Sequence, residues 1–146
     1  MSELSRIEQR VYLKAKPERV WRALTDRKEF ASWWGSDVNE AFAAGKTVEM
    51  SHAGEKYQVD IIEMSAPRKL VWRWHPGARD KTIDYSKEPK TTVSFDLVPF
   101  DNGTLLTVRE TGFEAAQLTR RPRAFTDNVN GWLGQAAALG KFLGRA

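Results

Sequence analysis

A single C-terminal stretch decides the fold: RAFTDNVNGWLGQAAALGKFL, residues 123–143. Apolar side chains recur in it every three or four residues, which is the spacing of one face of an α-helix. A stretch of this length makes about five helical turns, so it predicts the longest element of the chain. The stripe expected to face the core consists of Phe125, Val129, Trp132, Ala136, Leu139 and Leu143.

Glycine interrupts this predicted helix at Gly131, Gly134, Gly140 and Gly144. Each glycine costs about 1 kcal/mol of helix stability relative to alanine, which is a large loss for an element that anchors the fold. Two explanations stand. Either the sheet or a ligand approaches closely at Gly140, or the helix moves over the mouth of a cavity.

An uninterrupted series of strands precedes the helix. Apolar and polar residues alternate with period two, which indicates strands with one buried face. The sequence Asp101-Asn102-Gly103 favours a tight hairpin turn between the last two strands. Ile61 and Ile62 break the alternation, so a bulge or a strand end covered on both sides is expected there. The predicted strands are residues 7–15, 47–52, 57–64, 70–75, 91–98 and 104–111.

Two short helices are predicted between the first and second strands. Pro17 suits a first helical turn, where its missing N–H costs nothing. Asp26 followed by Glu29 resembles a capping box, and Gly35 is placed to end the second helix. The order β-αα-βββββ-α predicts an α+β fold, with a curved antiparallel sheet of six or seven strands around the C-terminal helix. We expect residues 1–146 to form one domain.

Composition limits the function further. The 146 residues include no cysteine, which excludes disulfides and thiol chemistry and suits a reducing, cytoplasmic location. The N-terminus lacks the apolar core of a signal peptide, and no run approaches the roughly 20 apolar residues of a membrane span. The net charge of +4 is small, and the basic cluster at residues 120–123 lacks interleaved aromatics. We therefore expect neither nucleic-acid binding nor membrane insertion.

Several motifs carry a family resemblance. Residues 16–25, together with the Trp33-Trp34-Gly35 end, resemble the opening of the START-like (SRPBCC) superfamily, and in particular the branch named for the activator of Hsp90 ATPase. Further matching motifs are residues 67–74, 103–108, 110–113 and 130–132. The resemblance covers nearly the whole chain and is specific for a fold rather than for an activity. A short stand-alone chain such as this one resembles the bacterial members.

The resemblance implies a helix-grip fold of the Bet v 1/START type, in which a bent sheet and the C-terminal helix enclose a cavity. In relatives this cavity accepts lipids, polyketides, hormones or other apolar molecules. The resemblance also implies two other roles. Aromatase and cyclase members place polar residues in the cavity, whereas the Hsp90-associated members of eukaryotes act through the domain surface as co-chaperones.

Aromatic residues are the clearest candidates for a binding site. They fall on the expected inner face of the sheet and on the facing stripe of the helix, where they suit a pocket for a flat or apolar ligand. The alternative is an ordinary core, because a fold of this size needs buried aromatics at this periodicity. The candidates are Trp34, Trp72, Trp74, Phe95, Phe125 and Trp132, with Met50 on a neighbouring strand.

Glu110 is the strongest polar candidate. If Leu106 and Val108 point inward, period two turns Glu110 inward as well, beside the C-terminal helix. A buried carboxylate there could act as a proton donor, a base or a ligand anchor. The alternative is an exposed glutamate at the end of a strand.

Four further polar side chains are weaker candidates. His52 shares the parity of Met50 on its strand, so it is expected on the inner face; an exposed histidine is the alternative. Tyr57, Asn128 and Gln135 could form hydrogen bonds with a ligand, or they could simply flank packed surfaces. None of these residues identifies a reaction.

Other chemistries lack their residues. The chain has only two histidines and no His-x-x-x-His spacing, so no metal site is predicted. It has no Gly-x-Ser-x-Gly elbow and no glycine-rich phosphate loop between a strand and a helix. We expect no cofactor and no nucleophilic catalysis.

Three hypotheses for the function follow. The first is non-catalytic binding of a small hydrophobic molecule between the sheet and the C-terminal helix, with residues 36–44 and 76–89 at the rim. The second is a cyclase, aromatase or hydrolase that uses Glu110, His52 and Tyr57. The third is a protein-interaction module, such as a chaperone accessory, that acts through a surface patch around residues 120–123. The chain is expected to be a monomer or a weak homodimer.

Overall fold

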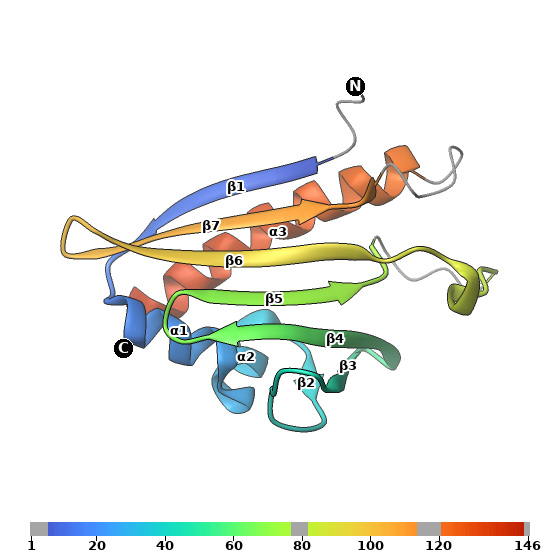
Figure 1. Cartoon of the computed structure of the whole chain (residues 1–146), viewed down its shortest axis with the longest axis horizontal. Helices are drawn as coiled ribbons and strands as arrows, with labels where there is room; N and C mark the ends of the chain where they lie inside the picture. Colours follow the sequence, from blue (N-terminus) through green and yellow to red (C-terminus); the bar gives the residue numbers. More distant parts are fainter. Residues whose placement is uncertain (1–5, 77–81, 114–120, 145–146) are drawn as a thin grey trace.

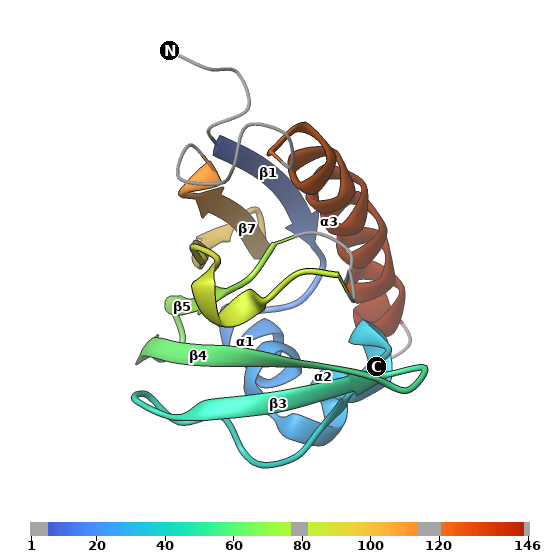
Figure 2. The same ribbon diagram turned by 90° about the vertical axis from the view of Figure 1, so that its right-hand side faces the viewer.

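The helix α3 (Arg121–Gly144) lies across the open side of a strongly curved antiparallel sheet (Figure 1, Figure 2). The computed structural model describes residues 6–76, 82–113 and 121–144. Within these ranges seven strands form one sheet in the order β1-β7-β6-β5-β4-β3-β2. The strands are β1 (Arg6–Leu13), β2 (Asp37–Val38), β3 (Thr47–His52), β4 (Glu55–Ser65), β5 (Lys69–Trp74), β6 (Thr91–Phe100) and β7 (Gly103–Thr111). The predicted α+β fold with a gripped C-terminal helix is confirmed.

The strands differ from the predicted ones mainly at their ends. The short edge strand β2 lies inside the connection that precedes β3, and it brings the number of strands to seven in the described part of the chain. The hairpin between β6 and β7 has positive φ angles at Asp101 (48°) and Asn102 (60°), as a two-residue hairpin turn requires. The predicted rim loop contains a short 3-10 helix, η1 (Tyr85–Lys87), and residues 77–81 of that loop lie outside the described residues.

A β-bulge explains the adjacent isoleucines of β4. Ile61 lies opposite Trp72 on β5, but Glu63 lies opposite Val71, so one residue of β4 has no partner. Ile61 is 1% exposed and faces the core, whereas Ile62 is 50% exposed. The bulge is therefore the correct one of the two explanations that the sequence left open.

The two short helices are α1 (Pro17–Thr25) and α2 (Arg27–Trp34). Asp26 caps α2, because its Oδ1 accepts hydrogen bonds from the backbone N–H groups of Lys28 (3.1 Å) and Glu29 (3.0 Å). The reciprocal half of the predicted capping box is absent. The Glu29 carboxylate instead pairs with Arg19 (2.6 Å) and Arg22 (2.8 Å) on α1, so it holds the two helices together. Gly35 ends α2 in the left-handed conformation, as expected (φ 91°).

Aromatic rings fill the middle of the space between the sheet and α3. The ring centroid of Trp72 lies 4.8 Å from that of Phe95 and 6.5 Å from that of Trp132, and Phe95 lies 5.6 Å from Trp132. All three residues are buried, although the Trp72 Nε1 atom has no hydrogen-bond partner among the described residues. The core interpretation is therefore correct for these three aromatics.

The buried stripe of α3 is the predicted one, with Trp132, Leu139 and Leu143 almost fully covered. A Cβ atom added at Gly140 would lie 4.0 Å from the nearest side-chain atom of Leu13, which is an ordinary contact distance. The sheet thus does not approach closely enough at Gly140 to require glycine. Of the basic cluster, Pro122 and Arg123 are exposed, whereas Arg120 and the Arg121 side chain lie outside the described residues.

No helix in the described ranges is both long enough and apolar enough to cross a membrane.

The cap of α2 provides a test of this local architecture. We expect Asp26→Ala to lower the free energy of unfolding by about 1 kcal/mol, because two backbone N–H groups lose their acceptor. Asp26→Asn keeps a side-chain oxygen at the cap and should change it by only a few tenths of a kcal/mol. Urea unfolding of both variants measures the difference, and equal losses in the two would contradict the cap.

Candidate functional site

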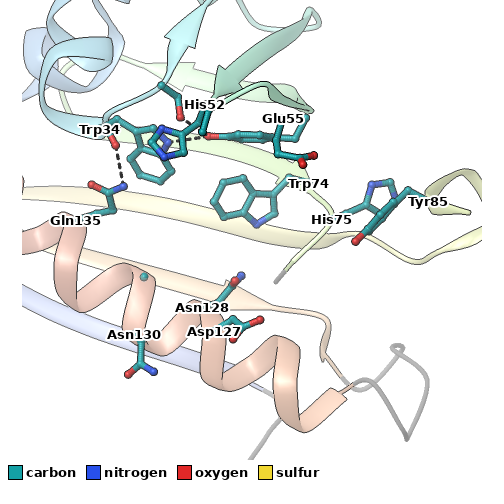
Figure 3. Close-up of a pocket in the computed structure, with 14 residues that line it drawn as sticks. Trp34, His52, Glu55, Trp74, His75, Tyr85, Asp127, Asn128, Asn130 and Gln135 are labelled. Atoms are coloured by element: carbon teal, nitrogen blue, oxygen red, sulfur yellow. Dashed lines mark hydrogen bonds between the residues drawn. The ribbon is translucent and has the colours of Figure 1, made fainter. Parts of the chain in front are cut away.

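A pocket of about 660 Å³ lies between one end of the sheet and the N-terminal half of α3 (Figure 3). It opens where β5 ends and where the turn between β3 and β4 approaches the helix. Figure 3 shows Trp34, His52, Trp74, His75 and Tyr85 on the opposite side of the pocket from α3. The described residues that line it are Trp34, Ser36, His52, Ala53, Glu55, Tyr57, Trp74, His75, Tyr85, Asp127, Asn128, Asn130, Gly131 and Gln135.

Three aromatic side chains form the inner wall of the pocket on the sheet side. The ring centroid of Trp74 lies 6.0 Å from that of Trp34 and 6.2 Å from that of Tyr57. The Trp34 Nε1–H donates a hydrogen bond to the Tyr57 hydroxyl oxygen (2.9 Å), which also lies 3.2 Å from the Ser36 Oγ. These contacts fix the orientation of the rings, so the wall exists before any ligand binds.

The helix wall combines polar side chains with a gap. Asn128, Gly131 and Gln135 recur at intervals of three and four residues, so they lie on one face of α3. The Gln135 Nε2 donates a hydrogen bond to the backbone oxygen of Trp34 (3.0 Å) and ties the two walls together. A Cβ atom added at Gly131 would meet no atom within 4 Å, because this position faces the open pocket. The missing side chain thus leaves room for a ligand.

Glu110 lies fully buried behind this pocket, with 0% of its surface exposed. On β7 it pairs with Ile7 of β1 and Val93 of β6, so the neighbouring strands offer it apolar side chains. Its carboxylate accepts hydrogen bonds from two residues of the sheet, the Trp74 Nε1–H (2.8 Å) and the Thr91 hydroxyl (2.5 Å). The prediction that Glu110 turns inward is confirmed.

The helix supplies the remaining donors to Glu110. The Asn128 Nδ2 lies 2.8 and 2.9 Å from the two carboxylate oxygens, and the Trp132 Nε1 lies 2.9 Å from Oε1. Asn128 and Trp132 are one helical turn apart, which points both side chains in the same direction. Four neutral donors from β5, β6 and α3 therefore converge on one carboxylate.

All four of these donors are uncharged. No ion pair with Glu110 occurs among the described residues. The two indole N–H groups can only donate, so the oxygens of Glu110 are their acceptors. The Glu110 carboxyl group is therefore held by dipoles and not by a counter-ion in the described part of the chain.

The predicted site residues divide into two groups. Those that line the pocket are Trp34, His52, Tyr57, Trp74, Asn128 and Gln135. Met50, Trp72, Phe95, Glu110 and Trp132 are buried around or behind it, and Phe125 is half-buried and packs against Phe113 with ring centroids 5.2 Å apart.

His52 corrects the expectation of an interior histidine. It occupies the end of β3, where it is exposed at the rim of the pocket, and its Nδ1 lies 2.6 Å from the backbone oxygen of Gly35. The alternation of β3 correctly predicted the side of the sheet on which His52 lies, but the strand ends there and that part of the inner face is not covered.

The residues of the predicted acid–base set do not form a hydrogen-bonded chain in the described structure. Glu110 accepts from four neutral donors, His52 contacts the Gly35 backbone oxygen, and Tyr57 contacts Trp34 and Ser36. None of these partners is titratable, so the contacts within the described residues give no relay for a proton. Within the described residues no group of three or more His, Cys, Asp or Glu side chains is placed to hold a metal ion.

Part of the remaining wall lies in segments that the sequence analysis expected at the rim. Ser36 lies in the segment 36–44 and Tyr85 in the segment 76–89. His75 and Asp127 were not identified as site residues. They come from a strand end and from the first turns of α3, where no periodic pattern marks the inner face.

A curved antiparallel sheet that grips a C-terminal helix, with a pocket at one end of that helix, defines a helix-grip protein of the START-like superfamily. The chain belongs to the family of Activator of Hsp90 ATPase homolog 1-like proteins, whose family model matches residues 14–144. Comparison with curated protein sequences gives no significant match.

Solved structures show the same fold at low sequence identity. Protein MLL2253 from Mesorhizobium loti is 21% identical with a TM-score of 0.80, and the match covers 97% of this chain and 98% of that one. The Aha1 dimer from Colwellia psychrerythraea is 22% identical with a TM-score of 0.68, over 93% and 98% of the two chains. DynU16, a protein of the dynemicin biosynthetic locus, is 18% identical with a TM-score of 0.73, over 95% of this chain and 47% of that one.

The Glu110 cluster predicts a large effect on stability. We expect Glu110→Leu to lower the free energy of unfolding by about 4 kcal/mol, because two indole N–H groups, a hydroxyl and an amide lose their buried acceptor. Glu110→Gln keeps one acceptor oxygen and should cost about 2 kcal/mol. Thr91→Val removes a single donor with little change in shape and should cost about 1 kcal/mol.

Chemical denaturation of the three variants tests this order. A Glu110→Leu protein as stable as the original would mean that the hydrogen bonds to Glu110 contribute nothing net to stability, and it would contradict the role given to the carboxylate.

Proposed function

We propose that this protein binds a small, flat, largely apolar molecule in the pocket between the sheet and α3. The observation that carries the proposal is an open pocket of about 660 Å³ with a wall of three ordered aromatic rings, Trp34, Tyr57 and Trp74. Ligand pockets typically measure about 300–1,000 Å³ and combine apolar walls with a few polar groups. This pocket has both features.

Polar groups lie on both walls of the pocket. Asn128 and Gln135 project from α3, and Ser36 and His52 lie on the side of the aromatic rings. Such groups orient a ligand whose body stacks on the tryptophans, and they favour molecules with a few hydrogen-bonding substituents over a plain hydrocarbon chain. Aromatic and polyketide-like compounds have this character. The place of DynU16 in a biosynthetic locus supports a ligand of the same general kind.

Binding without catalysis explains the site better than acid–base chemistry does. The Glu110 carboxylate already accepts hydrogen bonds from four neighbouring side chains, so a substrate would have to displace one of these donors to reach it. In this account Glu110 maintains the wall of the pocket and exchanges no proton.

Two glycines of α3 allow the proposal to be tested without damage to the fold. Gly131 lines the pocket and Gly134 lies on the exposed surface, and a Cβ atom added at either position meets nothing within 4 Å. Leucine at either position should improve helix stability by a few tenths of a kcal/mol to about 1 kcal/mol. Only Gly131→Leu places a side chain in the pocket.

We expect the original protein and Gly134→Leu to bind members of a panel of aromatic and lipid-like compounds, and Gly131→Leu to lose that binding at equal or higher thermal stability. Ligand-induced shifts in Tm and native mass spectrometry measure both properties. Failure of the original protein to bind any compound, or equal binding by the two variants, would overturn the proposal.

A further inference from the structure

The interior beneath α3 contains a second, smaller cavity beside the pocket. This apolar crevice measures about 20 Å³, which is room for about one water molecule. Leu24, Leu106 and Leu139 are among its walls, and apart from two glutamines its described lining residues are apolar. Cavities with such walls stay dry, and an apolar group that fills one gains contacts with the wall.

Gln135 is the one described residue that lines both the pocket and the apolar crevice. It projects from α3, and its Nε2 donates a hydrogen bond to the backbone oxygen of Trp34 at the end of α2 (3.0 Å, Figure 3). The two neighbouring tryptophans of α2 divide between the two spaces, because Trp34 lines the pocket and Trp33 lines the crevice. The Gln135 side chain thus lies at the boundary between pocket and crevice.

Two aromatic rings complete this boundary. The ring centroids of Trp34 and Trp132 lie 5.6 Å apart, and Trp132 lines the crevice. Their indole N–H groups donate to the Tyr57 hydroxyl (2.9 Å) and to Glu110 Oε1 (2.9 Å), which fixes both rings. Gln135 is half-buried, and its contact is with a backbone oxygen. Of the three side chains, it is therefore the one that can be shortened without loss of the Glu110 contacts or of the aromatic wall.

We infer that Gln135 limits the length of the ligand by closing the inner end of the pocket. A flat body binds against Trp34 and Trp74, but an apolar tail on that body cannot pass Gln135 into the crevice. The preferred ligand is therefore a compact ring compound, because a long tail finds no apolar space beyond the rings. This inference rests on the proposed function and adds a limit on ligand size to it.

Two probes separate the body of a ligand from its tail, namely naphthol and butylnaphthol. Isothermal titration calorimetry gives the ratio of their affinities. In the original protein we expect the two to bind within about twofold of each other, because the tail stays outside the apolar interior. In Gln135→Ala the tail enters the crevice, and butylnaphthol should bind about tenfold more tightly than naphthol, as expected for the burial of about two methylene groups.

Matched variants separate side-chain length from other effects. Gln135→Met keeps a side chain of similar length without the hydrogen bond to Trp34, so it should still exclude the tail. Gln9→Ala removes the other glutamine of the crevice, which does not line the pocket, and should also leave the affinity ratio unchanged. Gln135→Ser provides a second truncated variant if Gln135→Ala does not fold.

Nuclear Overhauser effects between ligand and protein locate the tail directly. In Gln135→Ala we expect contacts between the butyl protons and the methyl groups of Leu106 and Leu139, which line the crevice. In the original protein we expect none.

The outcomes separate the two proposals. If naphthol binds but the affinity ratio is the same in Gln135→Ala as in the original protein, the inferred limit is wrong while the pocket remains a binding site. A ratio that rises equally in Gln135→Met or Gln9→Ala would likewise overturn it, because neither variant shortens the side chain at the boundary. If neither compound binds to the original protein, the proposed function fails for ligands of this size, and this inference fails with it.

Discussion

The carboxylate of Glu110 is the interaction on which the rest of the structure depends. It lies in the interior with none of its surface exposed, and it is held by donors from β5, β6 and α3. A buried carboxyl group without hydrogen-bond partners would cost several kcal/mol, so the stability of the fold depends on these donors being in position. All four donors reach Glu110 only when the strands pair in one register and the helix docks in one rotation about its axis.

The pocket is a consequence of the same arrangement. Trp74 and Asn128 are at once donors to Glu110 and walls of the pocket, so the group that docks the helix also fixes the shape of the binding site. The space beneath α3 is filled in the middle by Trp72, Phe95 and Trp132 and is open at one end, where Gly131 replaces a side chain on the helix. The packed middle of this space thus stabilises the fold, and its open end provides the pocket.

Much of this fold could be predicted from the sequence, because periodicity is a local property. The stripe of α3, the alternation of the strands and the inward turn of Glu110 all follow from the spacing of apolar residues. The partners of Glu110 could not be predicted in this way, because they depend on strand register and on helix rotation, which bring residues 74, 91, 110, 128 and 132 together. The bulge at Ile62 shows the same limit: two adjacent isoleucines indicate an irregularity but not its geometry.

The pocket was the part least accessible to sequence reasoning. Four of its lining residues, Ser36, Ala53, His75 and Tyr85, come from turns and connections, which carry no period. The end of β3 shows why parity alone is insufficient, because His52 lies on the inner face but beyond the point where α3 covers it. The same limit explains why some of the predicted aromatic residues line the pocket and others belong to the core. Periodicity identifies the residues that face inward, but it does not show which part of the interior is left unfilled.

The most direct test of the central role of Glu110 is nuclear magnetic resonance of the tryptophan indole N–H groups, assigned with single Trp→Phe variants. The account predicts that the Trp74 and Trp132 signals lie downfield of that of Trp72, whose buried indole N–H has no partner among the described residues, and that they exchange slowly with solvent. Glu110→Gln should shift both signals together. Indole protons of Trp74 and Trp132 that exchange as fast as an exposed indole, or that do not respond to Glu110→Gln, would contradict it.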